Sequence, residues 1–197
     1  MAMFGKPDVV KLKEKRNIKG LMKALQYQKD WQIREYAARA LGQLNAREAI
    51  EELIPLLSDL VQEVRDAASE ALIHIGAPAV DALIAALSDA GAREMVARTL
   101  VGIGEPAVEP LCKVAEKGWF KHARRYAAWA LGEIGDPRAV NALLVTYMDS
   151  DTEVRESAAR ALKRLGESAV GALSTYLKAE DINVRRAAAR LLESIEQ

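Results

Sequence analysis

Hydrophobic positions recur along this chain about every three to four residues, the spacing of one face of an α-helix, and polar residues fill the positions between them. Residues 33–44, IREYAARALGQL, show the pattern clearly. Their apolar positions form one helical stripe, made of Ile33, Ala37, Ala40, Leu41 and Leu44. Residues 123–134, ARRYAAWALGEI, repeat the arrangement ninety residues later, with Trp129 where the first copy has Arg39. The pattern therefore predicts amphipathic helices that recur along the chain.

One arginine marks each copy of the motif V-R-x-x-A-A-x-A-L-x-x-I-G. The copies follow at intervals of 28 to 31 residues, and their marker arginines are Arg34, Arg65, Arg93, Arg124, Arg155 and Arg185. A constant period of about 20 to 50 residues is typical of a stacked array. In four copies an aspartate precedes the marker by four residues: Asp30, Asp89, Asp151 and Asp181. We interpret both sets as structural, with aspartates capping helices and arginines forming a ladder of Arg–Asp or Arg–carbonyl contacts.

A second helical pattern, A-V-x-x-L, precedes four of the six marker helices, as in residues 79–87 and 139–147. The links IGAPAV, IGEPAV and IGDPRAV place a glycine where a left-handed residue ends one helix. A proline follows where the next helix begins. Gly76, Gly104 and Gly135 are these glycines, and Pro78, Pro106 and Pro137 are these prolines. The links leave no room for a strand, and a two-helix unit must stack on a neighbour to bury both of its apolar faces.

The string DxxVRxxAAxALGxIGDxxAVxxLxxxL resembles the HEAT-like repeat of the phycobilisome-lyase type over residues 17–197. The resemblance implies an all-α fold, a right-handed α-α superhelix (α-solenoid) of six two-helix repeats. It also implies that the second helix of each repeat lines the concave side. Residues 1–16 are expected to form an N-terminal capping segment, and the remainder a single domain. The predicted repeats are residues 17–45, 46–76, 77–104, 105–135, 136–166 and 167–197.

Composition narrows the class of partner. The chain of 197 residues has 28 basic and 28 acidic side chains and so a formal net charge of zero. This balance argues against nucleic acid as a partner, because binding of nucleic acid ordinarily requires a basic surface.

No apolar run reaches the length of a signal peptide or a membrane span, so we expect a cytoplasmic protein that binds no membrane. Cys112 is the single cysteine; it takes a core position of a first helix, which predicts an inert buried thiol.

Catalytic and metal-binding patterns are weak in this sequence. His74 and His122 are the two histidines, and they lie one and a half repeats apart without a repeated carboxylate partner. Deoxyhypusine hydroxylase, which has a related architecture, binds two irons through several His-Glu dipeptides on its repeat helices. Neither histidine of this chain is followed by a glutamate. We therefore predict no metal, no cofactor and no enzymatic activity, although the resemblance to bilin lyases leaves a lyase-like activity open.

The positions that the packing motif leaves free predict a binding surface. Tyr126 and Trp129 are three residues apart and share a helical face, with arginines in neighbouring repeats. Exposed aromatic residues surrounded by arginine are enriched at binding hot spots. The predicted partner-binding residues are Tyr36, Arg39, Met95, Arg98, Tyr126, Trp129 and Arg160. The alternative is that Trp129 packs into the space that alanines leave.

These observations predict a non-catalytic scaffold that binds a peptide or another protein on its concave face. One alternative, carried by the resemblance, is an accessory or lyase-like factor in the maturation of phycobiliproteins. Another alternative is a HEAT-like protein that binds nucleic acid. DNA-repair glycosylases built on HEAT-like helices use Trp and Arg residues around a cleft, and this chain contains both residue types. We expect a monomer, with an end-to-end dimer as the alternative.

Overall fold

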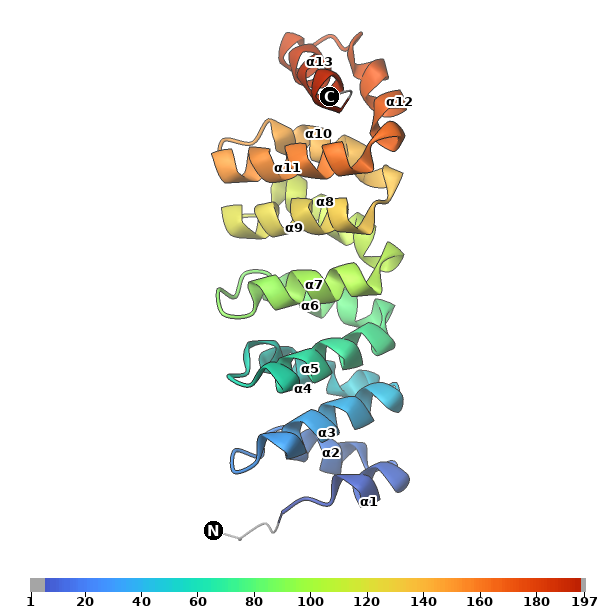
Figure 1. Ribbon diagram of the computed structural model, residues 1–197, viewed down its shortest axis with the longest axis vertical. Coiled ribbons are helices and arrows are strands. Elements are labelled where there is room, and N and C mark those ends of the chain that lie inside the picture. The colour runs from blue at the N-terminus through green and yellow to red at the C-terminus, as the bar shows by residue number, and fades with distance from the viewer. Residues whose placement is uncertain (1–5, 196–197) are drawn as a thin grey trace. The chain divides into compact units, whose positions relative to one another are not determined.

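Helices are the regular elements of this protein in the computed structural model, which describes residues 6–195 (Figure 1). No strand occurs within that range. The chain divides after Ile103 into two compact units, called here the N-terminal unit and the C-terminal unit. The predicted all-α solenoid fold is confirmed, while the count of six repeats, their boundaries and the right-handed sense stay predictions.

The N-terminal unit stacks helix pairs in two layers. Its α-helices are α1 (Val9–Glu14), α2 (Ile18–Ala24), α3 (Trp31–Gln43), α4 (Ile50–Leu53), α5 (Gln62–Ile75), α6 (Val80–Ala86) and α7 (Arg93–Ile103). Three short 3₁₀ turns connect them: η1 (Arg47–Ala49), η2 (Ile54–Ser58) and η3 (Ala77–Ala79). Helix α5 packs between α3 and α7, and α2, α4 and α6 pack against this row as the first helices of their pairs.

The C-terminal unit has the same construction. Its elements are η4 (Glu105–Ala107), α8 (Val108–Lys117), α9 (Lys121–Ile134), η5 (Pro137–Ala139), α10 (Val140–Tyr147), α11 (Thr152–Leu165), α12 (Glu167–Tyr176) and α13 (Ile182–Ile195). The second helices α9, α11 and α13 form one layer, in which α11 packs against both neighbours. The first helices α8, α10 and α12 form the other layer, with α10 in the middle (Figure 1).

The alanines and one glycine of the repeated segment allow neighbouring second helices to approach closely. A Cβ atom built on Gly42 of α3 would lie 2.6 Å from the Cα atom of Ala71 in α5. One built on Gly132 of α9 would lie 2.7 Å from the Cα atom of Ala161 in α11. Real carbon atoms do not approach so closely without repulsion, so these two crossings need glycine. The repeated A-L-G therefore encodes the same tight crossing in both units.

Glycines end several of the helices with a positive φ angle, as the links predict. Gly135 has φ 75° and ψ 16°, the predicted left-handed conformation. The prediction of that conformation is wrong for Gly76 and Gly104, whose ψ angles are −135° and −130°. Such ψ values at positive φ belong to a region that glycine alone enters readily, so glycine is still required.

Three of the four predicted aspartates accept a hydrogen bond from the backbone N–H groups of the first helical turn. Asp30 accepts from Gln32, Asp151 from Glu153 and Val154, and Asp181 from Asn183. The prediction is wrong for Asp89, because α7 begins only at Arg93. Asp89 instead accepts from the N–H of Gly91, 2.9 Å away, and so stabilises the turn before the helix.

No single helix of the described range is long and apolar enough to cross a membrane. Within residues 6–195, α5 combined with residues 77–86, a pair bent by 115°, reaches the required length and composition.

Candidate partner-binding surface

Each marker arginine binds the turn between the two helices of its own pair. Its guanidinium donates to a backbone carbonyl six or seven residues earlier in the chain. The accepting carbonyls belong to Tyr27, Asp59, Leu87, Gly118, Asp149 and Ala179. A charged donor satisfies a carbonyl that the turn would otherwise leave without a partner. These contacts fix how the second helices leave the turns, and so how their outer faces are presented.

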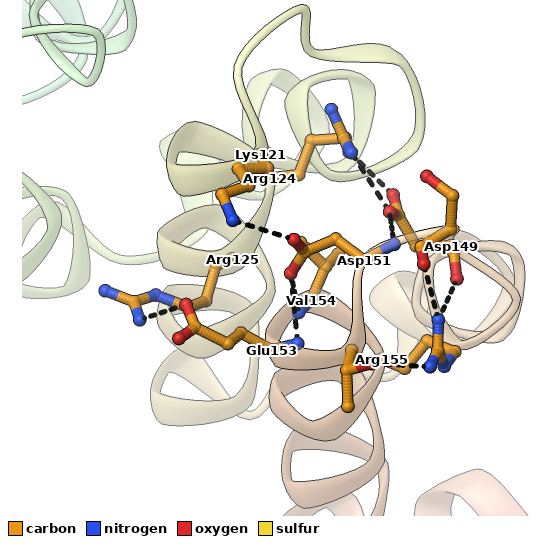
Figure 2. A network of polar contacts seen from close by, with 10 residues as sticks. Lys121, Arg124, Arg125, Asp149, Asp151, Glu153, Val154 and Arg155 are labelled. Carbon is orange, nitrogen blue, oxygen red and sulfur yellow. Dashed lines mark hydrogen bonds and ion pairs between the residues drawn. The ribbon is translucent and has the colours of Figure 1, made fainter.

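Two marker arginines also bind an aspartate 25 residues ahead. Arg124 meets Asp149 through two contacts, Nε–Oδ2 at 2.6 Å and Nη2–Oδ1 at 3.0 Å (Figure 2). Arg34 meets Asp59 in the same bidentate way, at 2.9 and 3.0 Å. Each aspartate follows the first helix of the next pair, so the ion pair joins consecutive pairs.

The electrostatics of these two pairs favour the ionised forms. Burial acts to raise the pKa of the Asp149 carboxyl, but hydrogen bonds from Arg124 and from the N–H of Asp151 outweigh it. The pKa of Asp149 therefore lies below its ordinary value. The pKa of Asp59 is lowered in the same way, since hydrogen bonds from Arg34 and the N–H of Val61 outweigh its burial.

Trp129 lies half-buried on the outer face of α9, between the two predicted alternatives of a packed and an exposed residue. It lines a surface groove of about 340 Å³ between α9 and α11. Arg160 and Arg164 of α11 line the same groove, and Arg164 is paired with Glu133 at 2.9 Å. The structure thus brings Trp129 and Arg160 together, as the sequence predicts.

Tyr126 is also half-buried, but it does not line the groove of Trp129. The guanidinium carbon of Arg125 lies 4.9 Å from the centroid of its ring, a cation–π contact. Arg125 in turn pairs with Glu153 at 2.8 Å (Figure 2). The Tyr126 ring therefore lies beside the positive charge of Arg125, which Glu153 already partly neutralises.

The remaining predicted binding residues lie in the N-terminal unit. Tyr36 is 51% exposed on α3, and Arg39 on the same helix pairs with Glu35 at 3.0 Å and with Glu70 of α5. Met95 and Arg98 of α7 line a groove of about 310 Å³. Arg98 pairs with Glu94 at 2.8 Å. Both predicted arginines of this unit are therefore neutralised by neighbouring carboxylates.

The seven predicted residues thus form two sets. Tyr36, Arg39, Met95 and Arg98 belong to one unit, and Tyr126, Trp129 and Arg160 belong to the other. A single patch that joins both sets stays a prediction.

Sequence reasoning missed a second groove of the C-terminal unit, of about 330 Å³. Arg186 and Arg190 of α13 line it, together with Arg155 of α11 and Tyr147 at the end of α10. The two α13 arginines are four residues apart on one helical face, which the sequence does show. The sequence does not show that these two arginines meet Arg155 and Tyr147, because those residues lie about thirty or more positions away in the chain.

Cys112 is less buried than predicted. Its side chain is only partly covered, although it lies on the first helix α8. Burial, helped by the charges of Glu116, Asp136 and Glu109, raises the pKa of the thiol to about 11. The thiol therefore stays protonated at neutral pH, which agrees with an inert cysteine.

The described residues contain no group of three or more His, Cys, Asp and Glu side chains placed to hold a metal ion. The His74 ring is exposed, and its Nδ1 atom lies 2.7 Å from the backbone oxygen of Glu70 in its own helix.

Stacked helix pairs, each with an arginine bound to the turn between its two helices, define a helical repeat protein. The model of HEAT repeats matches residues 18–100, 80–163 and 144–197. The chain therefore belongs to the HEAT repeat family, and the predicted resemblance to such repeats is confirmed.

Comparison with curated proteins shows a similarity to a phycobilisome maturation protein of Synechococcus elongatus. The two are 37% identical over 101 residues, which cover 50% of this chain and 49% of the relative. The matched region thus spans about half the length of the relative.

Two solved structures are also similar to this chain. The complex of CpcE and CpcF of phycocyanin lyase from Nostoc is 25% identical, with a TM-score of 0.47, over 73% of this chain and 98% of that one. Human deoxyhypusine hydroxylase is 22% identical, with a TM-score of 0.43, over 95% of this chain and 76% of that one.

Proposed function

We propose that this protein is an accessory factor of phycobilisome maturation that works by binding another protein. The observation that carries the proposal is the identity of 37% over 101 residues to a phycobilisome maturation protein. The matched stretch of 101 residues is about as long as three of the predicted repeats.

The exposed faces of the second helices support a binding role. Helical repeat arrays use such extended surfaces to hold partners. Trp129 stands half-buried in a groove beside Arg160, and tryptophan and arginine are the residues most enriched at binding hot spots. We propose that partners contact Tyr126, Trp129 and Arg160 in the C-terminal unit, and Tyr36, Arg39, Met95 and Arg98 in the N-terminal unit.

The proposal is tested by capture of phycobiliprotein subunits. The tagged chain is incubated with the α and β subunits of phycocyanin, and bound subunits are quantified by chromatography. The double variant Tyr126→Ala/Trp129→Ala should retain less than about a tenth of wild-type binding, because hot-spot aromatics each contribute more than 1 kcal/mol.

Trp119→Ala is the matched control, because Trp119 is 96% exposed in the turn before α9 and lies outside the groove. It should bind as the wild type does, and circular dichroism should show that all variants keep their helices. Absence of binding by the folded wild-type chain would contradict the proposed function.

We further propose that binding, rather than catalysis, is the main activity. Incubation of the chain with a free bilin and apo-phycocyanin distinguishes the two roles, because covalent attachment leaves a coloured band after denaturing electrophoresis. An accessory factor should give no coloured band by itself. A coloured band that requires this chain would establish a lyase instead.

A further inference from the structure

Positive charge gathers on one layer of the C-terminal unit. Its second helices α9, α11 and α13 carry ten Lys or Arg residues and four Glu residues. The second helices of the N-terminal unit, α3, α5 and α7, carry five basic and five acidic residues. The two units have the same construction, so packing alone does not account for this difference.

The excess is local, because residues 104–197 contain fourteen basic and fourteen acidic residues in all. Most of the acidic residues therefore lie on the first helices and in the turns. A neutral unit whose charges are separated in this way attracts a partner to one face only.

Ion pairs neutralise several of the ten basic residues but leave a distinct group. Lys121 pairs with Asp151, Arg124 with Asp149, Arg125 with Glu153 and Arg164 with Glu133. Arg155 and Arg185 are engaged with turn carbonyls. Of the ten, those that make neither such a turn contact nor an ion pair with any residue from 6 to 195 are Arg160, Lys163, Arg186 and Arg190.

Three of these four side chains line grooves. Arg160 lines the groove of Trp129, and Arg186 and Arg190 line the groove of about 330 Å³ at α13. Arg186 and Arg190 stand at positions i and i+4, where two like charges repel each other and weaken the helix. Arg155 adds a third positive charge to the same groove, with Tyr147 and Asn183 as polar neighbours. A bound carboxylate relieves this repulsion, and each guanidinium can hold it through two hydrogen bonds.

We propose that the face formed by α11 and α13 binds an acidic segment of a partner protein, with carboxylates seated on Arg186, Arg190 and Arg160. This inference rests on the proposed protein-binding function and identifies the chemistry of the partner. Nucleic acid fits the same face less well, because it needs a broadly positive domain whereas this unit is neutral overall.

Fluorescence anisotropy of a labelled peptide of alternating Glu and Ala residues tests the proposal. The intact chain should bind the peptide at low salt and should not bind the corresponding Lys and Ala peptide. Arg186→Gln/Arg190→Gln should weaken binding at least about tenfold, since each loses a charged contact. Lys113→Gln/Arg138→Gln removes the same number of charges from side chains of the same unit that are already paired, Lys113 with Glu109 and Arg138 with Asp136 and Glu105, and it should leave affinity within about twofold.

Three results with peptides and oligonucleotides would overturn the inference. They are no binding of the acidic peptide by the intact chain, an equal loss in both double variants, and tighter binding of a DNA or RNA oligonucleotide than of the peptide. Capture of phycocyanin subunits is measured with the same variants. Subunits that bind the wild type and Arg186→Gln/Arg190→Gln equally would refute the acidic docking face and leave the proposed function intact.

Discussion

Gly132 stands where α9 crosses α11, and a methyl group there would meet atoms that belong to Ala161. The added Cβ would lie 2.7 Å from both the Cα and the Cβ of Ala161. Contact between carbon atoms is favourable only at about 3.5 to 4.0 Å, so Gly132→Ala must push the helices apart by about 1 Å. Ala161 is itself buried, and its Cα is part of the helix backbone, so no side-chain rotation relieves the overlap.

Two opposing effects set the magnitude. Replacing glycine by alanine in the middle of a helix stabilises the helix by about 1 kcal/mol. Overpacking a close crossing costs about 3 kcal/mol when backbone atoms have to move, the upper part of the usual range. Gly132→Ala should therefore lower the free energy of unfolding by about 2 kcal/mol, which corresponds to a fall in Tm of about 4 to 8 °C for a chain of this size.

Gly171→Ala is the matched control. Gly171 lies in α12 of the same unit, and a Cβ there meets no atom within 4 Å. Helix propensity then acts alone, and the variant should gain up to about 1 kcal/mol. Thermal unfolding followed by circular dichroism measures both midpoints. A Gly132→Ala midpoint at or above the wild-type value would refute the close crossing of α9 and α11.

Four further predictions concern helix packing, ion pairing and thiol reactivity. Gly42→Ala should lower Tm as Gly132→Ala does, because its Cβ would lie 2.6 Å from the Cα of Ala71; a raised Tm in differential scanning calorimetry would contradict this. Asp149→Asn should cost about 1 to 3 kcal/mol in urea unfolding at neutral pH, because Arg124 loses its charged partner. Since the folded-state pKa values of Asp149 and Asp59 are lowered, the stability that they contribute is present above the ordinary Asp pKa of about 3.9 and is lost as the pH falls through the folded values. A urea midpoint that stays constant from neutral pH to well below that value would contradict this assignment. Cys112, with its pKa of about 11, should react with iodoacetamide at pH 8 far more slowly than free cysteine does, and equal rates would exclude the raised pKa.

Local rules predicted much of this fold. The spacing of apolar residues locates the helices, the G-x-P links locate the breaks, and the marker arginines locate the turns that they bind. These features depend on contacts within one helix pair, so a short stretch of sequence contains all the residues involved. The prediction for Asp89 was wrong because the first turn of α7 forms later than in the other copies.

The candidate binding surface was only partly predictable. Trp129 and Arg160, which stand at equivalent positions of neighbouring repeats, share a groove, whereas Tyr126 lies outside it. The groove of Arg186 and Arg190 includes residues from α10, α11 and α13. Its composition depends on which side chains three helices bring together, and that information is spread over more than one repeat.

The sequence by itself determined that about thirty residues make a helix pair and that the pairs must stack, since an amphipathic helix buries its apolar face or is not stable. It also determined where α5, α7 and α9 end, because a glycine follows each of them and a proline lies in the next element, two residues after that glycine. Only the tertiary structure decided that Gly42 and Gly132 sit at tight crossings, that Arg39 pairs with Glu70 of the next second helix, and that Arg160, Arg186 and Arg190 form no ion pair with the described residues. The physical reason is range: helix ends follow from neighbours in the chain, whereas close approach and ion pairing depend on distances between side chains that the sequence keeps about thirty residues apart.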